Sequence, residues 1–186
     1  GKLFMVDCGE GTQMRFARLG LSMKRVGHIF ISHAHGDHCL GLPGLICTMS
    51  LLGRTSQLHI HGPQELEPYL QTALQLFCPN LEFQVLFHTV DTTVHQIVHE
   101  DRSIEVWSLP LRHRVPCCGY LFREKPGQHH IRRDMIDMYE IPVSQINNIK
   151  AGMDWTLPDG TLIPNSRLTS PPSPTRSFAY CSDTAL

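Results

Sequence analysis

The sequence predicts an α/β fold, and three observations support this prediction. An apolar run at residues 2–7 precedes a glycine turn and then apolar residues at helical spacing, so strand, turn and helix follow one another. The same succession returns at residues 57–77. Between them, the β-branched and aromatic run at residues 28–32 leads directly into a histidine-rich loop. In open α/β sheets, ligands collect at this carboxyl end of the strands.

The helices of the first half are predicted from the spacing of apolar residues. After the first strand, Met14, Ala17 and Leu21 share one face of a helix within residues 12–23. Residues 40–53 are interpreted as a loop that passes into a buried helix. The helix expected at residues 63–77 has a single apolar stripe, formed by Leu66, Leu70, Ala73, Leu74 and Phe77.

The second half of the chain has a different pattern. Residues 82–113 alternate between apolar and polar and contain turn residues, which predicts antiparallel strands. Residues 124–152 are more polar and predict two short helices broken at Pro142, in an insertion that projects from the sheet. A surface connection rich in Pro and Ser is expected at residues 164–177, before a last strand that ends in an aspartate.

Composition bounds the class of protein. A chain of 186 residues predicts one domain, residues 1–186, and 41% hydrophobic with 18% charged residues is typical of a soluble globular protein. No apolar run approaches the roughly 20 residues that cross a bilayer, so no membrane insertion is expected. With a net charge of −1 the surface as a whole is not basic, so metal ions and local patches would have to supply the positive charge for a polyanion such as nucleic acid. Seven cysteines without paired spacing favour a reducing, cytoplasmic location.

The stretch "SHAHGDH", residues 32–38, is the strongest functional signal. In an extended segment His33, His35 and Asp37 can share one side, while Gly36 permits a sharp turn and His38 points elsewhere. Such a loop can supply two imidazoles to one metal ion, and a carboxylate with a third imidazole to a second ion. The ligand types favour zinc, with manganese or iron as alternatives, and the absence of a nearby thiolate argues against a closed structural zinc site. The alternative is a polar loop that is merely rich in histidine.

Two further residues follow predicted strands in the same way. His113 comes after residues 103–111, and Asp183 comes after residues 178–182. Taken alone, His113 would be interpreted as an exposed histidine in a turn, and Asp183 as an aspartate that ends a strand. Together with the upstream cluster, His113 would complete a three-nitrogen face and Asp183 could bridge both ions.

The segments "DCGEGT", "SHAHGDHCLGLPGL", "PLRHRVPCCGYLF" and "YCSDT" resemble, in this order, the motifs of the metallo-β-lactamase superfamily, and specifically those of the ribonuclease Z (tRNase Z) family. The resemblance implies an αββα sandwich that is incomplete at both ends of this chain. It implies that His33, His35 and His113 bind one zinc ion and that Asp37 and His38 bind the other. Asp183 would then bridge the two ions, and Asp37 would also accept the proton of the attacking water. Asp7 would either support the metal loop or fix a tight turn.

The resemblance implies a zinc-dependent endoribonuclease, with two Zn²⁺ ions or Mn²⁺, that removes the 3′ trailer from precursor tRNA. Metal-activated water would attack the phosphodiester and leave a 3′-hydroxyl on the tRNA. Residues 124–152 would form a tRNA-binding arm, in which Arg132, Arg133 and Lys150 contact phosphates or simply form a solvated surface. Many bacterial relatives have a Gly-Pro pair where this chain has "PVSQI". A homodimer, in which each arm serves the partner's active site, is implied as well.

The chain also departs from the family pattern. A glycine-rich opening strand, a final metal-binding histidine and a second histidine with a glutamate are missing, so we expect a piece of a longer enzyme that folds poorly alone. One alternative function is a small-substrate hydrolase such as a metal-dependent phosphodiesterase of the same superfamily, for which the arm has no use. Another is a non-catalytic RNA-binding scaffold. The remaining histidines are expected at half-exposed sheet positions or on the arm, without a role as ligands: His59, His61, His88, His95, His99, His129 and His130.

Overall fold

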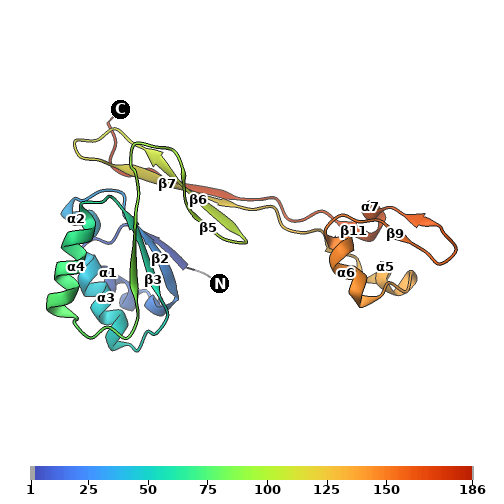
Figure 1. Ribbon diagram of the computed structural model, residues 1–186, viewed down its shortest axis with the longest axis horizontal. Helices are drawn as coiled ribbons and strands as arrows, with labels where there is room; N and C mark the ends of the chain where they lie inside the picture. Colours follow the sequence, from blue (N-terminus) through green and yellow to red (C-terminus); the bar gives the residue numbers. More distant parts are fainter. Residues whose placement is uncertain (1–2, 186) are drawn as a thin grey trace. The chain divides into compact units, whose positions relative to one another are not determined.

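The computed structural model describes residues 3–185, which form two compact units (Figure 1). The described part of the first unit comprises residues 3–100, 105–122 and 178–185, and the second comprises residues 101–104 and 123–177. The segment expected as an inserted arm, residues 124–152, lies entirely within the second unit, which continues to residue 177. Among the described residues, no helix is both long enough and apolar enough to span a bilayer.

The first unit is built on a parallel sheet in the order β1-β2-β3-β4. Its strands are β1 (Leu3–Val6), β2 (Val26–Phe30), β3 (Leu58–Gly62) and β4 (Val85–Thr89). The prediction that residues 82–113 are all antiparallel is wrong for β4, which pairs parallel to β3. The helix between these strands returns the chain to the starting edge of the sheet, so β4 runs in the same direction as β3.

Helices cover one face of this sheet (Figure 1). They are α1 (Thr12–Arg18), α3 (Gly41–Leu51) and α4 (Leu66–Phe77), with a 3₁₀ turn, η1 (Met23–Arg25), and the short α2 (Gly36–Cys39). The predicted buried helix is α3, whose Leu42, Leu45 and Ile46 are fully buried against Ile29 and Ile60 of the sheet. Alternate strand residues therefore form the main core.

A second sheet, in the order β12-β7-β6-β5, packs against the opposite face. Its strands are β5 (Ile97–Glu100), β6 (Ile104–Pro110), β7 (Cys118–Glu124) and β12 (Ser177–Tyr180), and β5 and β6 are antiparallel as predicted. The Tyr120 hydroxyl donates a 2.8 Å hydrogen bond to the Ile31 carbonyl, and the Phe30 ring meets Phe122 edge-on at 5.4 Å. The described part of the first unit thus supplies helix, sheet and sheet layers of the predicted αββα class.

The inner face of the parallel sheet is rich in histidine. The strand register places His28 beside His59 and His61 beside His88, all facing away from the helices. The expectation of half-exposed positions is wrong for His61, which is 2% exposed. Burial, followed by the neighbouring imidazoles, lowers the pKa of His61 to about 2, so its ring is neutral at physiological pH.

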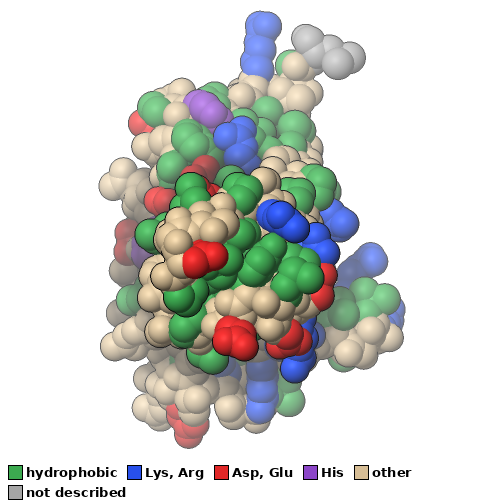
Figure 2. All heavy atoms as spheres, turned by 90° about the vertical axis from the view of Figure 1, so that its right-hand side faces the viewer, with side chains coloured by type: hydrophobic (Ala, Val, Ile, Leu, Met, Phe, Trp, Pro, Cys, Tyr) green, Lys and Arg blue, Asp and Glu red, His purple; other side chains and the backbone are tan. Residues whose placement is uncertain are grey.

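The second unit has its own small core, formed by Met135, Ile141, Ile149, Ile163 and Leu168. The two predicted helices are present as α5 (Arg133–Met138) and α6 (Val143–Lys150), and Pro142 caps the start of α6. Antiparallel pairs join β8 (His130–Ile131) to β11 (Thr169–Ser170) and β9 (Trp155–Thr156) to β10 (Leu162–Ile163). Figure 2 shows apolar side chains near the centre of the face that this unit turns to the viewer, with charged side chains around them.

The predicted surface connection at residues 164–177 is only partly correct. It contains α7 (Asn165–Leu168) and β11, and Leu168 is fully buried. The Asn165 amide donates to the carbonyl oxygens of Ile149 at 2.7 Å and Met153 at 2.8 Å. These long-range hydrogen bonds order a segment whose Pro and Ser content alone is typical of a loop.

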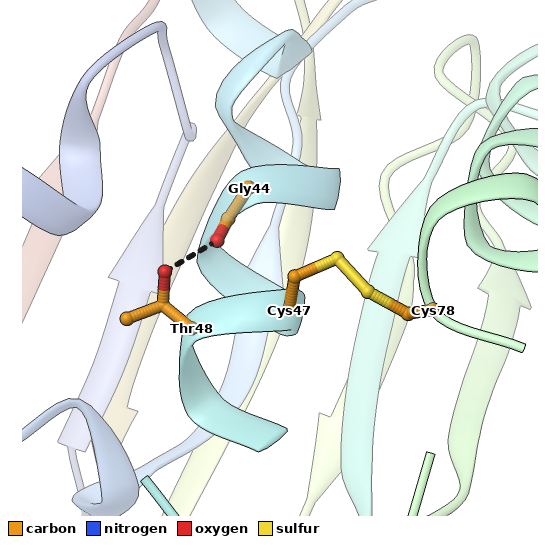
Figure 3. The surroundings of a disulfide bond; sticks show 4 residues. All are labelled: Gly44, Cys47, Thr48 and Cys78. Atoms are coloured by element: carbon orange, nitrogen blue, oxygen red, sulfur yellow. Dashed lines mark hydrogen bonds between the residues drawn. A yellow bond between two sulfur atoms is a disulfide. The ribbon is translucent and has the colours of Figure 1, made fainter. Parts of the chain in front are cut away.

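A disulfide joins Cys47 of α3 to Cys78 just after α4 (Figure 3). The two cysteines are 31 residues apart in sequence, yet their Cα atoms lie 6.0 Å apart. The spacing of the cysteines does not reveal this pair, because helix packing rather than sequence spacing brings the two residues together. Within the described residues the other five cysteines are free thiols.

Candidate metal centre

The histidine-rich loop begins directly after β2, at the carboxyl edge of the parallel sheet. His33 is fully buried, and His35 precedes the first residue of α2. Asp37 and His38 therefore lie on a helical turn. The extended geometry expected for residues 33–37 is wrong from Gly36 onward. Once Gly36 starts the helix, side chains follow a period of 3.6 rather than 2 residues. As a result, His38 and Asp37 face the same region, with 3.4 Å between His38 Nε2 and Asp37 Oδ2.

Four candidate ligands from three parts of the chain converge. One ligand atom each from His33, His35, His113 and Asp183 lies within 4.8 Å of the others. His35 Nδ1 is 3.0 Å from His33 Nε2 and 3.4 Å from His113 Nε2. Three imidazoles and a carboxylate at this spacing form a donor set suited to zinc or a similar cation.

Asp183 also approaches the other two candidate ligands, Asp37 and His38. Its Oδ2 lies 4.0 Å from His33 Nε2 and 3.9 Å from His38 Nε2. The Asp37 side chain is 78% exposed, whereas that of His38 is 13% exposed. One carboxylate therefore lies between the three-imidazole group and the Asp37 and His38 pair, as expected for a bridging ligand.

Asp7 holds the candidate ligands in place through hydrogen bonds. Its carboxylate accepts hydrogen bonds from the Ser32 amide at 2.8 Å, the Ser32 hydroxyl at 3.0 Å, His38 Nδ1 at 2.7 Å and the Tyr180 hydroxyl at 2.9 Å. Its backbone φ of 57° is left-handed, a conformation that is uncommon for residues other than glycine. Of the two alternatives stated for Asp7, these contacts support the first, a support for the metal loop. Because Nδ1 of His38 donates to Asp7, Nε2 is left to accept a cation.

The hydrogen-bond network also orients His33. The Ser32 hydroxyl donates to Asp7, accepts from Ser182 at 2.9 Å, and lies 2.9 Å from His33 Nδ1. This assigns the proton of His33 to Nδ1 and leaves Nε2 for a ligand. Sequence reasoning missed Ser32, Tyr180 and Ser182, although Ser32 and Ser182 directly precede candidate ligands.

Burial and charge act differently on the two buried imidazoles. Desolvation, and then the neighbouring histidines, lowers the pKa of His33 and favours the neutral form that binds metals. Burial also opposes charge on His38, but the hydrogen bond and charge of Asp7, with Asp37 and Asp183, raise its pKa overall. A divalent cation would bind the neutral His33 directly, and at His38 it would displace a proton that the surrounding carboxylates favour.

Close backbone packing holds the loop in place. The Cys8 amide donates to the His38 carbonyl at 2.7 Å, and the Gly41 amide donates to the Cys8 carbonyl at 2.9 Å. A Cβ on Gly9 would overlap the Asp37 carbonyl oxygen, and a Cβ on Gly41 would overlap that of Gly9. Glycine is therefore required at both positions for the two segments to meet.

Two clefts flank the centre. One of about 500 Å³ is lined by Arg112, His113, Arg114 and Asp183, with Thr184 and Ala185. Another, of about 480 Å³, lies beside Asp37 and includes Glu10 and Arg15. Arginines beside the candidate ligands favour an anionic substrate.

The residues predicted to contact substrate on the arm lie in the second unit. Arg132 forms a 2.6 Å ion pair with Asp134, so its charge is already partly compensated. Arg133 is exposed, and Lys150 lines a cavity of about 720 Å³ together with Arg102, Lys125 and His129. This unit therefore has a local basic surface on a chain whose net charge is −1.

Comparison with known proteins places the chain in a family. Residues 1–114 match the family model described as Anti-Pycsar protein Apyc1. The chain is 53% identical over 185 residues to Ribonuclease Z of Parabacteroides distasonis, covering 100% of this chain and 61% of that protein. It is 55% identical over 183 residues to Ribonuclease Z of Bacteroides fragilis, covering 98% of this chain and 60% of that protein. The chain thus spans about three fifths of the length of these curated relatives.

Solved structures give the same result. Human tRNase Z, short form, is 30% identical with a TM-score of 0.59, and the match covers 65% of this chain and 54% of that chain. A diphosphatase from the PhnP family is 22% identical with a TM-score of 0.51, covering 75% and 53% of the two chains, and shows the fold alone. The chain therefore belongs to the family that the Apyc1 model describes, and it is similar in sequence and structure to proteins named Ribonuclease Z and tRNase Z.

Proposed function

We propose that the protein is a metal-dependent endoribonuclease that removes the 3′ trailer from precursor tRNA and leaves a 3′-hydroxyl on the tRNA. The observation that carries the proposal is the convergence of His33, His35, His113 and Asp183 at one edge of the sheet, with Asp37 and His38 beside them. The names of the relatives, Ribonuclease Z and tRNase Z, supply the substrate class.

The residues present fit a pair of zinc ions, with manganese as an alternative. His33, His35 and His113 would hold one ion, Asp37 and His38 the other, and Asp183 both. When bound, such a pair supplies an activated water of near-neutral pKa and positive charge for the phosphate.

The chain's own groups have separate tasks. Asp37, exposed at the mouth of the site, accepts the proton of the attacking water. Asp7 keeps the His38 ring in one orientation through its 2.7 Å hydrogen bond. Arg112 and Arg114, which line the cleft next to His113, bind phosphate oxygens near the cleaved bond.

The second unit acts as the arm that binds tRNA away from the centre. Arg133 and Lys150 contact backbone phosphates, and Arg132 contributes less because Asp134 is its partner. The protein works as a homodimer in the cytoplasm, with each arm serving the partner's site. The resemblance to the ribonuclease Z family supports this part of the proposal.

The test is cleavage of a precursor tRNA with a 3′ trailer, in added zinc or manganese, by the wild type, Asp37→Ala and Glu82→Ala. Glu82 is an exposed carboxylate outside the site and serves as the matched control. We expect one cut beside the discriminator base, lost in Asp37→Ala and kept in Glu82→Ala. Turnover of bis(p-nitrophenyl) phosphate with intact tRNA would instead assign a small-substrate phosphodiesterase. Less than one zinc per chain without any cleavage would indicate a scaffold.

A further inference from the structure

A second group of histidines lies outside the candidate metal centre, between the two sheets. His28 of β2 and His61 of β3 extend from the inner face of the parallel sheet, and His99 of β5 extends from the second sheet. No residue of the first centre belongs to this group, which we call the inter-sheet cluster: His28, His61 and His99.

The side chains of the inter-sheet cluster converge on one point. One ligand atom from each of the three rings lies within 4.8 Å of the other two. His28 Nδ1 is 3.2 Å from His61 Nε2, and the ring centroids of His28 and His99 are 4.0 Å apart. Since two neutral imidazole nitrogens at 3.2 Å can share only one proton, a cation that accepts electron pairs from all three rings fits this arrangement.

Stacked neighbouring rings hold the cluster in place, and one nitrogen of His61 stays without a partner. His28 stacks on His59 at 4.6 Å and His61 stacks on His88 at 4.6 Å, while His59 and His88 form their own 2.9 Å contact. His61, although 2% exposed, has a buried Nδ1 without a hydrogen-bond partner. Buried polar atoms are nearly always paired, so the His61 ring is not held by ordinary hydrogen bonding; its other nitrogen, Nε2, is the one that faces His28.

The apolar face of the same strands shows what an ordinary interior would contain. Ile29 and Ile60, which alternate with these histidines, are fully buried against the helices. Strands of a parallel sheet covered on both faces are usually apolar throughout. Three imidazoles that meet between the two sheets therefore replace the apolar side chains expected there. Their grouping is typical of metal ligands.

We propose that the inter-sheet cluster is a second metal site, in which His28, His61 and His99 bind one divalent transition-metal ion, Zn²⁺ in preference, and join β5 to the parallel sheet. Three imidazole nitrogens without a carboxylate favour zinc over magnesium or calcium. At a Zn–N distance of about 2.0–2.1 Å, ligand nitrogens of a tetrahedral ion are roughly 3.4 Å apart, close to the 3.2 Å between His28 and His61. A water molecule takes the fourth position.

The first experiment counts bound zinc after chelation, reloading with Zn²⁺ and removal of the excess. We compare the wild type with His28→Phe, His61→Phe and His99→Phe, because phenylalanine keeps an aromatic ring in the stacked cluster. His95→Phe is the matched control, since His95 is exposed and stacks on Trp107 away from the group. We expect each cluster variant to bind one zinc ion fewer per chain than the wild type and His95→Phe. Equal zinc counts in folded cluster variants would overturn the proposal.

A second experiment does not depend on folding of the cluster variants. In His35→Ala/His113→Ala, the candidate catalytic centre loses two of its imidazoles while the inter-sheet cluster is untouched. We expect this protein to retain one tightly bound zinc ion, with an X-ray absorption spectrum of nitrogen and oxygen ligands and several imidazoles. A protein without zinc at this stage would refute the site. Loss of precursor-tRNA cleavage in Asp37→Ala tests the proposed function separately, because Asp37 contacts no member of the cluster.

Discussion

Removal of the Asp7 carboxylate tests how the metal loop is held. The side chain is 10% exposed and accepts hydrogen bonds from both polar groups of Ser32, from His38 and from Tyr180. Asp7→Ala leaves these donors facing an apolar methyl group. Asp7→Asn keeps one carbonyl oxygen and tolerates the left-handed φ of 57°, but presents an NH₂ group to donors.

The expected change in the free energy of unfolding follows from these hydrogen bonds. A hydrogen bond to a charged group contributes about 1.5–3 kcal/mol, and the contributions within one network do not add. Loss of one partner of a buried charged pair costs about 3–5 kcal/mol, and alanine at a left-handed position adds roughly 1 kcal/mol. We therefore expect Asp7→Ala to lower the free energy of unfolding by about 4–6 kcal/mol and Asp7→Asn by somewhat less. Both should weaken zinc affinity by roughly 10–100-fold, as loss of a group that orients a metal ligand does.

Two assays separate stability from orientation. Urea unfolding followed by circular dichroism gives the stability change, and competition with a chelator gives zinc affinity. Tyr180→Phe is the control, because it removes one donor at 2.9 Å and leaves the carboxylate, for an expected loss of about 1 kcal/mol. If Asp7→Ala unfolds within 1 kcal/mol of the wild type and binds zinc equally well, the carboxylate does not hold the loop and the reasoning fails.

Three further predictions concern the rest of the chain. Cys47→Ser should lower stability by about 3–4 kcal/mol relative to the oxidised protein, since the bond to Cys78 spans 31 residues; identical urea midpoints of oxidised and reduced wild type would contradict this. Tyr120→Phe should cost about 1–2 kcal/mol in urea unfolding, because a buried carbonyl loses its 2.8 Å donor, and no measurable change would exclude that contribution. In filter binding, Arg133→Ala should weaken affinity for precursor tRNA and flatten its salt dependence more than Arg132→Ala, whose charge is compensated; equal effects would refute this ranking.

Local patterns were sufficient to predict most elements and the candidate ligands. Strand, turn and helix periodicity identified β1 to α4, and the motif at residues 32–38 indicated metal chemistry. His113 and Asp183 were predicted from their place after strands, because strand ends meet at one edge of a sheet. Pro142 correctly separated the two arm helices, since its missing amide cannot continue a helix.

Features that depend on distant partners were decided by the tertiary structure. β4 is parallel because a helix crosses over before it, and Cys47 meets Cys78 only through the packing of α3 and α4. Asp7 supports the loop through residues as far away as Tyr180. The sequence alone determined which residue types could bind a metal ion. The burial of His61 and its approach to His28 and His99 depend on strand register and sheet packing, which no local pattern contains.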